Sequence, residues 1–554
     1  MRNSVSVALA GSGGAGVMTA GNMLLEAAAA AGYYGLMTRT SGPQIRGGEA
    51  AAMVRIATFP TDAQEDRFHA LAAIDWQNVG RFAAEIPLGP HSLIVGDPAH
   101  GAPPEAFLQS GARYLPIPLK KLAGEIQGAW PNMVALGVLA GLMGIPAAAV
   151  EAAARKSMKK GLEPGLSAFR LGMAQVASLE DFFLGEPKAG AARWLVSGNE
   201  AAGYGALRGG VRFVAAYPIT PATELLEWLA PALAKVGGTL VQAEDELASI
   251  NMALGASYGG VPSLTATSGP GLSLMIESLG LGVTAEVPVV VVDVMRTGPS
   301  TGIATKSEQG DLNIALYGMH GDAPHIVVAP NSLADCIAAT QWAVGLAESL
   351  QVPAIVLSDQ YFGQARAIVD APALQEMNFQ RETAKANGAY KRYALTDSGV
   401  SPMAIPGTAG CAYTADGLEH NERGTPSSQA GDHLAQMDKR ARKISQLDPG
   451  DAWASIEGDG ETAVVTFGSC TGPVREALLD KKVKLISLRL LSPAQPERLN
   501  KALEGVKRVL VVEQNHSGQF LRYLRSEYEL PGEVKSLRRP GPLPFRPAEI
   551  QKAL

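Results

Sequence analysis

The chain has 554 residues, a length that suggests three or four domains at about 150 residues per domain. Its composition is 47% hydrophobic and 18% charged, which is typical of a folded protein and excludes a disordered chain. The net charge of −6 shows no basic excess of the kind that nucleic-acid binding favours. We therefore expect no nucleic-acid partner.

The cysteine count limits the metal chemistry of the chain. There are three cysteines, Cys336, Cys411 and Cys470, and they are far apart in the sequence. An iron–sulfur cluster usually takes four cysteines, and a structural zinc takes four closely spaced ligands. We expect this chain to hold neither a cluster nor another metal. So few cysteines also argue against a secreted protein built on disulfides.

Two apolar stretches are relevant to localisation. Val5–Ala10 breaks at once into glycine-rich sequence, so it is too short for a signal peptide. Met133–Val150 is uncharged but contains several glycines and Pro146, which favours two short core helices over a membrane span. The sequence predicts a cytoplasmic protein without a membrane segment.

Residues 1–184 follow a βαβ pattern that predicts an α/β domain. The expected elements are strands at Val5–Ala10, Tyr33–Thr38, Ala51–Ala57 and Ser92–Gly96, with a helix at Val17–Ala31. A linker is expected at 185–193, where Gly, Ala and Pro cluster.

Residues 194–370 predict a second α/β domain. Its expected strands are Phe213–Tyr217, Thr239–Ala243, Ser263–Thr267, Val287–Met295, His325–Ala329 and Ala354–Leu357. The Val287–Val294 segment is β-branched almost throughout, which is typical of a central strand in a parallel sheet. Because ligands bind beyond the carboxyl ends of such strands, we expect the chemistry in the loops that follow them.

The rest of the chain predicts a connector and a third domain. Residues 371–457 show little alternation and end in a helix-like segment, Met437–Ile444. Residues 458–554 predict another α/β unit. Its expected elements are strands Thr462–Phe467, Val483–Leu488 and Arg508–Val512 and helices Thr471–Leu479 and Gln519–Tyr528.

A glycine motif lies between the first strand and the first helix. Gly11, Gly13 and Gly16 form GxGxxG, and Gly14 adds a fourth glycine. Such a loop brings a phosphate to a helix N-terminus, although it can also bind another anion or form only a tight turn. A nicotinamide site is one such possibility. The acid expected about 20 residues later is missing, but Arg39 could suit a 2′-phosphate.

Polar residues also follow four strands of the second domain. The segments are Tyr217-Pro218-Ile219-Thr220-Pro221, Glu244-Asp245-Glu246, Thr267-Ser268-Gly269-Pro270-Gly271 and the loop that begins at Arg296. Each has a structural explanation, such as Thr220 as a helix N-cap or the acids as partners of a helix dipole. Four such loops at one sheet edge instead predict a site that binds an anionic substrate, with Arg296 as the cation.

These motifs identify the chain as similar to the 2-oxoacid:ferredoxin oxidoreductases, and it most resembles the fused gamma–alpha subunit of the 2-oxoglutarate type. The resemblance rests on the glycine motif, Thr40–Gly48, Gly198–Ala201, the four loops, Arg296–Leu312 and Glu513–Asn515 with Gly518-Gln519. It implies a gamma-type domain (1–184), a thiamine diphosphate pyrimidine-binding domain (194–370) and a transketolase-C-like domain (458–554).

The resemblance also implies a reaction: coenzyme A-dependent oxidative decarboxylation of a 2-oxoacid, with electrons passed to ferredoxin. The expected substrate is 2-oxoglutarate, and the reverse direction would fix CO2 in a reductive tricarboxylic acid cycle. Glu246 is the expected partner of the thiamine aminopyrimidine N1′, and Glu244 is the second choice. Thr220 and Arg296 are the expected substrate ligands. The expected cofactor residues are Tyr217, Pro218, Ile219, Glu246, Ser268, Gly269, Pro270 and Gly271, and a coenzyme A path is expected near Gly11, Gly13, Gly14 and Gly16.

A partner subunit is implied because part of the thiamine site is missing. Gly458-Asp459-Gly460 resembles the start of the magnesium–diphosphate signature, but it precedes its strand and lacks the later Asn, so it predicts only a turn. A beta subunit should therefore bring Mg²⁺, the GDG…N loop and clustered cysteines for a [4Fe-4S] cluster. The implied assembly is a heterotetramer with two copies of each subunit.

The sequence leaves the substrate and the reaction class partly open. Ala222, Thr223 and Ala304 depart from the family pattern near the substrate loops, so pyruvate, branched-chain or aryl 2-oxoacids are alternative substrates. The motifs are also compatible with a non-redox thiamine-dependent decarboxylase subunit, a nicotinamide-binding regulatory protein or a scaffold with a degenerate thiamine fold.

Overall fold

The computed structural model describes the whole chain apart from residues 43–47, 188–189, 191, 374–378 and 386–388. The described residues form two compact units. Unit 1 contains those of Met1–Ser197, Gln364–Ala373 and Phe545–Lys552, and unit 2 contains those of Gly198–Gly363, Leu374–Pro544 and Ala553–Leu554. Both units are α/β, so the predicted fold class is confirmed.

Unit 1 is built on a mixed sheet with the strand order β6-β5-β4-β1-β3-β2-β14-β7. The strands are β1 (Ser4–Gly11), β2 (Tyr34–Ser41), β3 (Ala50–Ala57), β4 (Ala70–Ala73), β5 (Leu93–Gly96), β6 (Arg113–Pro116), β7 (Arg193–Ser197) and β14 (Arg366–Asp370). The helices are α1 (Val17–Ala30), α2 (Glu105–Leu108), α3 (Leu119–Gly124), α4 (Pro131–Met143), α5 (Ala147–Ser157), α6 (Leu162–Ala174) and α18 (Pro547–Ala553), with short 3₁₀ turns at Val79–Phe82 and Pro98–His100.

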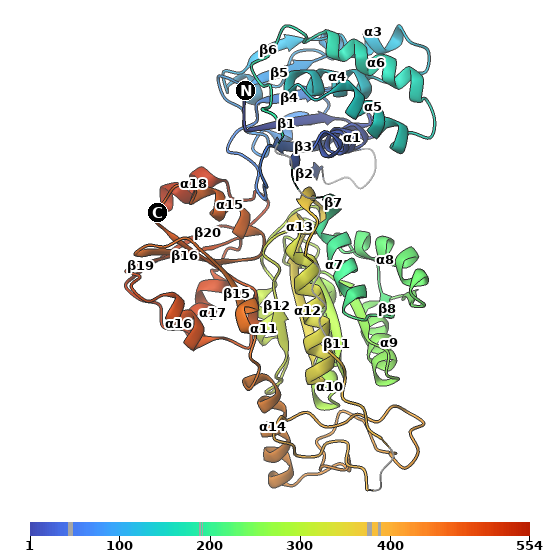
Figure 1. The fold of residues 1–554 in the computed structure, drawn as a ribbon, viewed down its shortest axis with the longest axis vertical. Coiled ribbons are helices and arrows are strands. Elements are labelled where there is room, and N and C mark those ends of the chain that lie inside the picture. Colours follow the sequence, from blue (N-terminus) through green and yellow to red (C-terminus); the bar gives the residue numbers. More distant parts are fainter. Residues whose placement is uncertain (43–47, 188–189, 191, 374–378, 386–388) are drawn as a thin grey trace. The chain divides into compact units, whose positions relative to one another are not determined.

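The first sheet buries both of its faces. Alternate residues of β1 enter two different cores, because successive side chains of a strand point to opposite faces. Val5, Val7 and Leu9 pack with the helices α1, α4, α5 and α6, whereas Ala8 and Ala10 face the opposite core, which contains Phe68. Figure 1 shows these helices gathered on one side of the sheet.

The uncharged stretch Met133–Val150 forms core helices, as the sequence predicts. Its residues are divided between α4 and α5. α4 lies very close to α6, because a Cβ atom at Gly137 would be 2.0 Å from Phe169 O and one at Gly172 would be 2.1 Å from Val134 O. In the described part of the chain, every helix is too short or too polar to cross a membrane.

Some elements of unit 1 come from distant parts of the sequence. β14 pairs with both β2 and β7, although β14 and β7 were assigned to the second domain by their position in the sequence. The Tyr34 hydroxyl donates a 2.7 Å hydrogen bond to Asp370, and this contact helps to hold β14 beside β2. Most of α18 also belongs to this unit, where Ala548 N donates to Asp66 Oδ1 at 2.9 Å.

Unit 2 contains a sheet with the order β18-β12-β13-β11-β10-β8-β9. Its strands are β8 (Phe213–Ala216), β9 (Thr239–Gln242), β10 (Ser263–Thr267), β11 (Val289–Met295), β12 (Ile326–Val328), β13 (Pro353–Asp359) and β18 (Leu490–Ser492). Its helices are α7 (Gly198–Arg208), α8 (Thr223–Lys235), α9 (Glu246–Tyr258), α10 (Gly269–Thr284), α11 (Leu312–Tyr317), α12 (Asp335–Leu350) and α13 (Gln360–Gln364, whose last residue belongs to unit 1). As predicted, β11 is buried throughout and pairs in parallel with β10 and β13.

A third sheet lies in unit 2, with the order β15-β17-β16-β19-β20. Its strands are β15 (Ala454–Glu457), β16 (Thr462–Phe467), β17 (Lys484–Leu488), β19 (Arg508–Glu513) and β20 (Glu533–Arg538). Its helices are α15 (Thr471–Ala477), α16 (Pro496–Ala502) and α17 (Gln519–Glu527), with 3₁₀ turns at Gly450–Trp453 and Gly468–Cys470. β15 was placed in the connector by sequence, but it pairs with β17.

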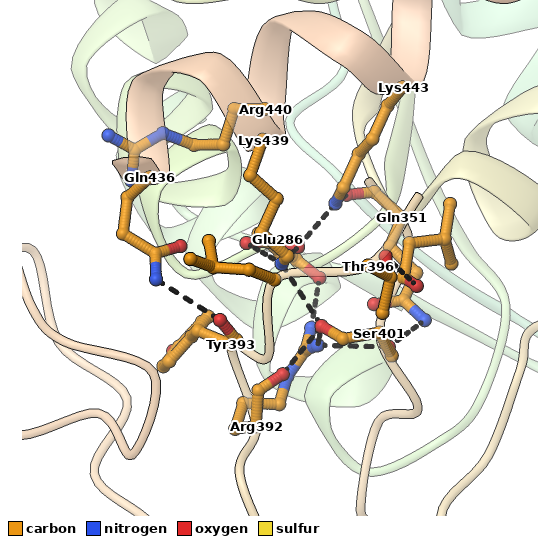
Figure 2. A network of polar contacts seen from close by, with 12 residues as sticks. Glu286, Gln351, Arg392, Tyr393, Thr396, Ser401, Gln436, Lys439, Arg440 and Lys443 are labelled. Atoms are coloured by element: carbon orange, nitrogen blue, oxygen red, sulfur yellow. Dashed lines mark hydrogen bonds and ion pairs between the residues drawn. The ribbon is translucent and has the colours of Figure 1, made fainter. Parts of the chain in front are cut away.

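The connector contains one long helix, α14 (Ala430–Ser445), and Figure 2 shows how this helix is anchored. The carboxylate of Glu286, which is 0% exposed, accepts hydrogen bonds from Lys439 Nζ at 2.6 and 2.7 Å. Lys443 Nζ donates to the same carboxylate, and Arg392 Nη2 donates to the Glu286 carbonyl at 2.7 Å. One buried anion thus faces three cations.

The imbalance of charge affects the ionisation of this cluster. Burial alone would raise the pKa of Glu286, but the charges of Lys443 and Lys439 outweigh it and hold that pKa below its usual range. Burial lowers the pKa of Lys443 to about 7, although the carboxylate of Glu286 opposes this shift. The cluster joins α14 to the segment between α10 and β11.

Candidate functional site

Four polar loops lie at one edge of the second sheet. β9, β8, β10 and β11 are parallel neighbours in that order, so the loops that follow them all leave the sheet at its carboxyl edge. These loops carry Tyr217–Pro221, Glu244–Glu246, Thr267–Gly271 and Arg296. The prediction that they gather at one edge is confirmed by the strand pairing.

The Tyr217–Pro221 loop supplies no side-chain cap to α8, so the Thr220 hydroxyl can bind a ligand instead. That helix begins at Thr223, and the residue before it is Ala222, so the explanation of Thr220 as an N-cap is wrong. A turn in which Ala222 N donates to Ile219 O at 2.7 Å delays the start of the helix. Tyr217 and Thr220 are exposed at this loop, and Pro218 and Ile219 are half-buried.

The three acids after β9 have different environments. Asp245 caps α9, since its Oδ1 accepts a 2.7 Å hydrogen bond from Ala248 N. Glu244 is exposed to solvent, whereas Glu246 is only 8% exposed. Within the described residues, no donor is hydrogen-bonded to the Glu246 carboxylate. The role of partner to the dipole of α9 therefore suits Asp245. Glu246 is the buried acid, and its carboxylate can bind a ligand.

The Thr267–Gly271 loop brings the start of α10 against Glu246. A Cβ atom at Gly271 would lie 2.0 Å from Thr267 Oγ1 and 2.9 Å from Glu246 Oε1, so only glycine fits there. Ser268 is completely buried, and its hydroxyl has no hydrogen-bond partner among the described residues. Pro270 follows in the first turn of α10. The predicted residues Glu246, Ser268 and Gly271 are thus brought together.

Arg296 directly follows β11 and reaches the loop after β8. Its Nη1 donates a 2.7 Å hydrogen bond to the Thr220 carbonyl, so the two predicted substrate residues are in contact. Its Nε is buried and has no partner among the described residues. Burial lowers the pKa of the guanidinium, and the charge of Asp311 opposes that shift. Arg296 therefore has donor capacity left for an anion.

A cavity of about 580 Å³ lies beside Arg296 within unit 2. It is bounded by the start of α10, the loop after Arg296, the segment before α11 and the loop after β19. The residues that line it are Gly269, Pro270, Ser273, Arg296, Gly298, Pro299, Ser300, Glu308, Gly310, Asp311, Ile314, Asn515, His516, Ser517 and Gln519. Burial raises the pKa of Glu308, and it also raises that of Asp311 to about 6.

The Glu513–Asn515 motif shapes this cavity from the third sheet. The Glu513 carboxylate accepts hydrogen bonds from Phe520 N at 2.7 Å and Leu521 N at 3.0 Å, and so it caps α17. Gln514 N donates to Gln309 Oε1 at 2.9 Å. These bonds are structural, and they place the following residue, His516, at the cavity wall.

Sequence reasoning missed several groups near this cavity, namely Asp293, Glu308, Asp311 and His516. Asp293 carried a signal, because it is the charged residue within the apolar β11 strand. It is 0% exposed, and neither of its carboxylate oxygens has a donor among the described residues. Glu308 and Asp311 lie in the Arg296–Leu312 segment, where their roles could not be separated by sequence alone.

The glycine loop of unit 1 is occupied in part by an internal carboxylate. Ser12 donates to Asp75 Oδ2 through its backbone N–H at 3.0 Å and its hydroxyl at 2.7 Å. Gly14 has a φ of +89°, and a Cβ there would meet no atom within 4 Å. Gly16 has a φ of +82° and lies against Asn132. The coenzyme A path at Gly11, Gly13, Gly14 and Gly16 stays a prediction.

The topology of unit 1 does not support a nicotinamide site. β3 lies between β1 and β2 and is antiparallel to both. A dinucleotide fold instead has adjacent parallel strands on either side of the glycine loop. The family motif Thr40–Gly48 includes residues 43–47, which lie outside the described part of the chain.

The Gly458-Asp459-Gly460 segment forms a turn, as predicted. Gly458 has a φ of +71°, and a Cβ there would lie 2.6 Å from Val483 O. The segment joins β15 to β16, so the expectation that it does not follow a strand is wrong. Because β15 is antiparallel to β17, and β17 is parallel to β16, the segment lies at the amino edge of the parallel strands and does not supply a metal loop at a carboxyl edge.

Two family models match the chain. Residues 6–175 match "Pyruvate ferredoxin/flavodoxin oxidoreductase", and residues 204–439 match "Pyruvate flavodoxin/ferredoxin oxidoreductase, thiamine diP-bdg". The second match includes the four polar loops and most of α14. The first region lies within the predicted domain 1–184, whereas the second begins within the predicted domain 194–370 and extends through most of the connector.

Curated relatives and a solved structure extend the likeness. The chain is 35% identical to 2-oxoacid:ferredoxin oxidoreductase 1, subunit alpha, from Sulfurisphaera tokodaii, over 65% of this chain and 61% of that protein. It is 33% identical to 2-oxoglutarate synthase subunit KorA from Methanothermobacter marburgensis, over 64% of this chain and 97% of that protein. The chain thus spans about three fifths of the first relative and nearly all of the second.

The structural match covers the whole chain. It is to the 2-oxoglutarate:ferredoxin oxidoreductase from Magnetococcus marinus with 2-oxoglutarate, coenzyme A and succinyl-CoA bound. The TM-score is 0.91 and the identity 35%, over 100% of this chain and 99% of that chain. The chain therefore belongs to the 2-oxoacid:ferredoxin oxidoreductases, as an alpha subunit.

Proposed function

We propose that the chain is the alpha subunit of an enzyme that oxidises 2-oxoglutarate with coenzyme A and oxidised ferredoxin. The products are succinyl-CoA, CO2 and reduced ferredoxin, with two electrons transferred one at a time to two ferredoxins. The observation that carries the proposal is the gathering of Glu246, Gly271, Thr220 and Arg296 at one sheet edge. Pyruvate and branched-chain or aryl 2-oxoacids are the alternative substrates.

The residues around Glu246 fit the pyrimidine half of thiamine diphosphate. A buried carboxylate with free acceptor positions lies against a glycine that leaves no room for a side chain. Such a carboxyl can hold a proton at a ring nitrogen, which is the role we assign to Glu246 at N1′. When bound, thiamine diphosphate supplies the carbon nucleophile for the oxo group and accepts the electrons released on decarboxylation. The Ser268 hydroxyl supplies a further buried hydrogen-bonding group.

Arg296 and Thr220 form the proposed grip on the substrate. The guanidinium has a buried Nε without a partner in the described residues, and a planar guanidinium pairs well with a carboxylate. The exposed Thr220 lies in the loop whose carbonyl holds Arg296. This arrangement suits the 1-carboxylate and 2-oxo oxygen that all 2-oxoacids share. The preference for 2-oxoglutarate is supported by the relatives that carry its name.

A beta subunit completes the site in this proposal. It would supply Mg²⁺, the GDG…N diphosphate loop and a [4Fe-4S] cluster that passes electrons to ferredoxin, in an assembly of two alpha and two beta subunits. α9 and α10 pack against each other, and each exposes large apolar side chains, including Leu247 (50%) and Leu274 (51%). Such side chains are suited to an interface with another subunit.

Anaerobic co-expression with the candidate beta subunit tests this function. The purified complex should reduce a viologen dye in the presence of 2-oxoglutarate and coenzyme A. Pyruvate, branched-chain and aryl 2-oxoacids should be compared under the same conditions. The Arg296→Lys variant should raise the KM for the 2-oxoacid at least about tenfold, because lysine cannot pair in a bidentate way. Arg508→Lys, at an exposed position at the start of β19, is the matched control.

The outcomes distinguish the substrates and the reaction classes. A preference for another 2-oxoacid would correct the substrate and leave the reaction class in place. Release of CO2 without dye reduction would instead show a non-redox decarboxylase. No turnover with any 2-oxoacid, in a complex that contains its cluster and thiamine diphosphate, would refute the proposal.

A further inference from the structure

We infer that Asp293 and Asp311 form a buried carboxyl pair that shares one proton and so controls how strongly Arg296 binds the carboxylate of the substrate. The inference rests on the proposed function for the identity of the substrate. It assigns a positioning role to Asp293, which lies on β11 behind the cavity. The pair itself is defined by the structure of unit 2.

The environment of Asp293 is the first part of the argument. Its side chain is 0% exposed in a strand that is otherwise apolar, and neither carboxyl oxygen has an N–H or O–H donor among the described residues. The group that faces it is the Asp311 carboxyl, whose Oδ2 is also buried and without such a donor. Two carboxyls can hydrogen-bond to each other only when one of them holds a proton.

Asp311 connects this pair with the candidate site. It lines the cavity together with Arg296. It also lies directly against the start of α10, because a Cβ atom at Gly269 would be 2.5 Å from Asp311 Oδ1. Glycine at this position therefore lets the carboxyl approach the loop that carries Ser268 and Gly271.

The burial of the pair and the charged groups around it favour a state in which the two carboxyls share one proton. Burial raises the pKa of Asp293 well above its usual range, and the charge of Asp311 raises it further. Burial also raises the pKa of Asp311, to about 6, in the presence of Glu308, Arg296 and the Gly269 N–H group. His516 is a further titratable group that lines the cavity, and it lies near Glu308. Two like charges in one buried site ionise in two separate steps.

The shared proton has a direct consequence for Arg296. Within the described residues, no carboxylate lies within ion-pair distance of its guanidinium, and only the more distant charge of Asp311 acts on it. With one proton on the pair, a single negative charge competes with an incoming carboxylate. When both carboxyls are protonated the competition ends, and when both are ionised it doubles.

Asp293→Asn is the test variant, because an amide keeps the shape and the hydrogen bond but holds no titratable proton. In the assembled enzyme, the KM for 2-oxoglutarate should fall as the pH is lowered through about 6 and rise at alkaline pH, by on the order of tenfold per charge, with kcat less affected. The variant should lose the alkaline change, because only Asp311 can still ionise. Its acid-side change should move to lower pH, because the like charge is gone and the amide can donate to Asp311. Asp359→Asn, at the end of the neighbouring strand β13, is the control and should keep both changes.

A second readout does not depend on turnover. Infrared spectroscopy of the complex labelled with ¹³C-aspartate should show the C=O stretch of a protonated carboxyl at pH 7, and Asp293→Asn and Asp311→Asn should each remove it. If both variants keep that band, the shared proton is refuted. If the band is present but the KM profile of Asp293→Asn equals that of the wild type, the proposed control of Arg296 is refuted. Failure of the proposed function would show itself separately, as absence of turnover with the band intact.

Discussion

Replacing Glu286 with Gln should release α14 from the rest of unit 2. The change removes the anion that faces Lys439 and Lys443, which are 0% and 1% exposed, and it leaves the hydrogen-bonding shape nearly unchanged. Breaking a buried ion pair by removing one partner costs about 3–5 kcal/mol, because the remaining charge stays buried without compensation. We expect a loss of stability near the upper end of this range, because two ammonium groups lose their partner.

The effect should be local, so hydrogen–deuterium exchange measured by mass spectrometry is the suitable assay. A loss of about 3–5 kcal/mol corresponds to about two to four orders of magnitude faster exchange, provided that the amides exchange through local opening of the helix. Peptides from Ala430–Ser445 should show this change, whereas peptides from unit 1 should not.

Lys443→Met provides the matched variant. In the wild type, burial lowers the pKa of the Lys443 ammonium group to about 7. Replacing Lys443 with an apolar side chain therefore removes a desolvation cost together with one ion pair. Glu286 keeps Lys439 as its partner, at 2.6 Å. We therefore expect a change within about 1 kcal/mol, and the double variant should exchange more slowly than Glu286→Gln alone. Equal destabilisation by the two single variants, or no effect of Glu286→Gln, would refute this reasoning.

The candidate site and the α14 cluster support three further predictions. Glu246→Gln should lower viologen reduction by about 10²–10⁴-fold, because an amide cannot hold the proton at N1′, and a larger loss in Glu244→Gln would favour the second choice instead. Gly271→Ala should lower kcat without unfolding α10, because its Cβ would lie 2.0 Å from Thr267 Oγ1, whereas Gly280→Ala on the same helix meets nothing within 4 Å and should retain activity. The folded-state pKa of Lys443, about 7, lies below its usual 10.5, so the unfolded chain binds the extra proton between these values. Urea denaturation should therefore show this contribution to stability growing with pH across that window, by up to about 1.4 kcal/mol per unit, and Lys443→Met should lack it.

Most strands of the two sheets in unit 2, although not β15, β18 and β20, could be predicted from sequence because the pattern there is strong. β10 and β16 match the predicted ranges, and β8 and β11 differ only at their ends. Long β-branched runs between amphipathic helices leave few other interpretations. In contrast, β4 (Ala70–Ala73) was missed, because four residues of Ala and Leu have little preference for a strand. Its pairing with β1 supplies what the local sequence does not.

Contacts between distant segments were beyond sequence reasoning. β14 joins β2 although more than 300 residues separate them, and the alternation of β14 does not show which sheet it enters. Similarly, Glu286 and Lys439 are unremarkable in sequence, and their pairing exists only because α14 packs against the segment between α10 and β11. The loops after the strands were predictable for a different reason: parallel strands place their carboxyl ends at one edge whichever order the strands take.

Asp293 shows how the two kinds of information combine. In sequence it is a single acid in a strand whose other residues are apolar, and for the fold alone a valine would be more stable, because a buried carboxyl without donors costs free energy. The structure shows that the group facing this acid is Asp311, on the wall of the cavity that contains Arg296. A residue that weakens the strand but reaches the candidate site is best explained by that site. The same reasoning predicts that Asp293→Val would stabilise β11 and abolish the rise of the substrate KM at alkaline pH, an outcome that a purely structural role could not produce.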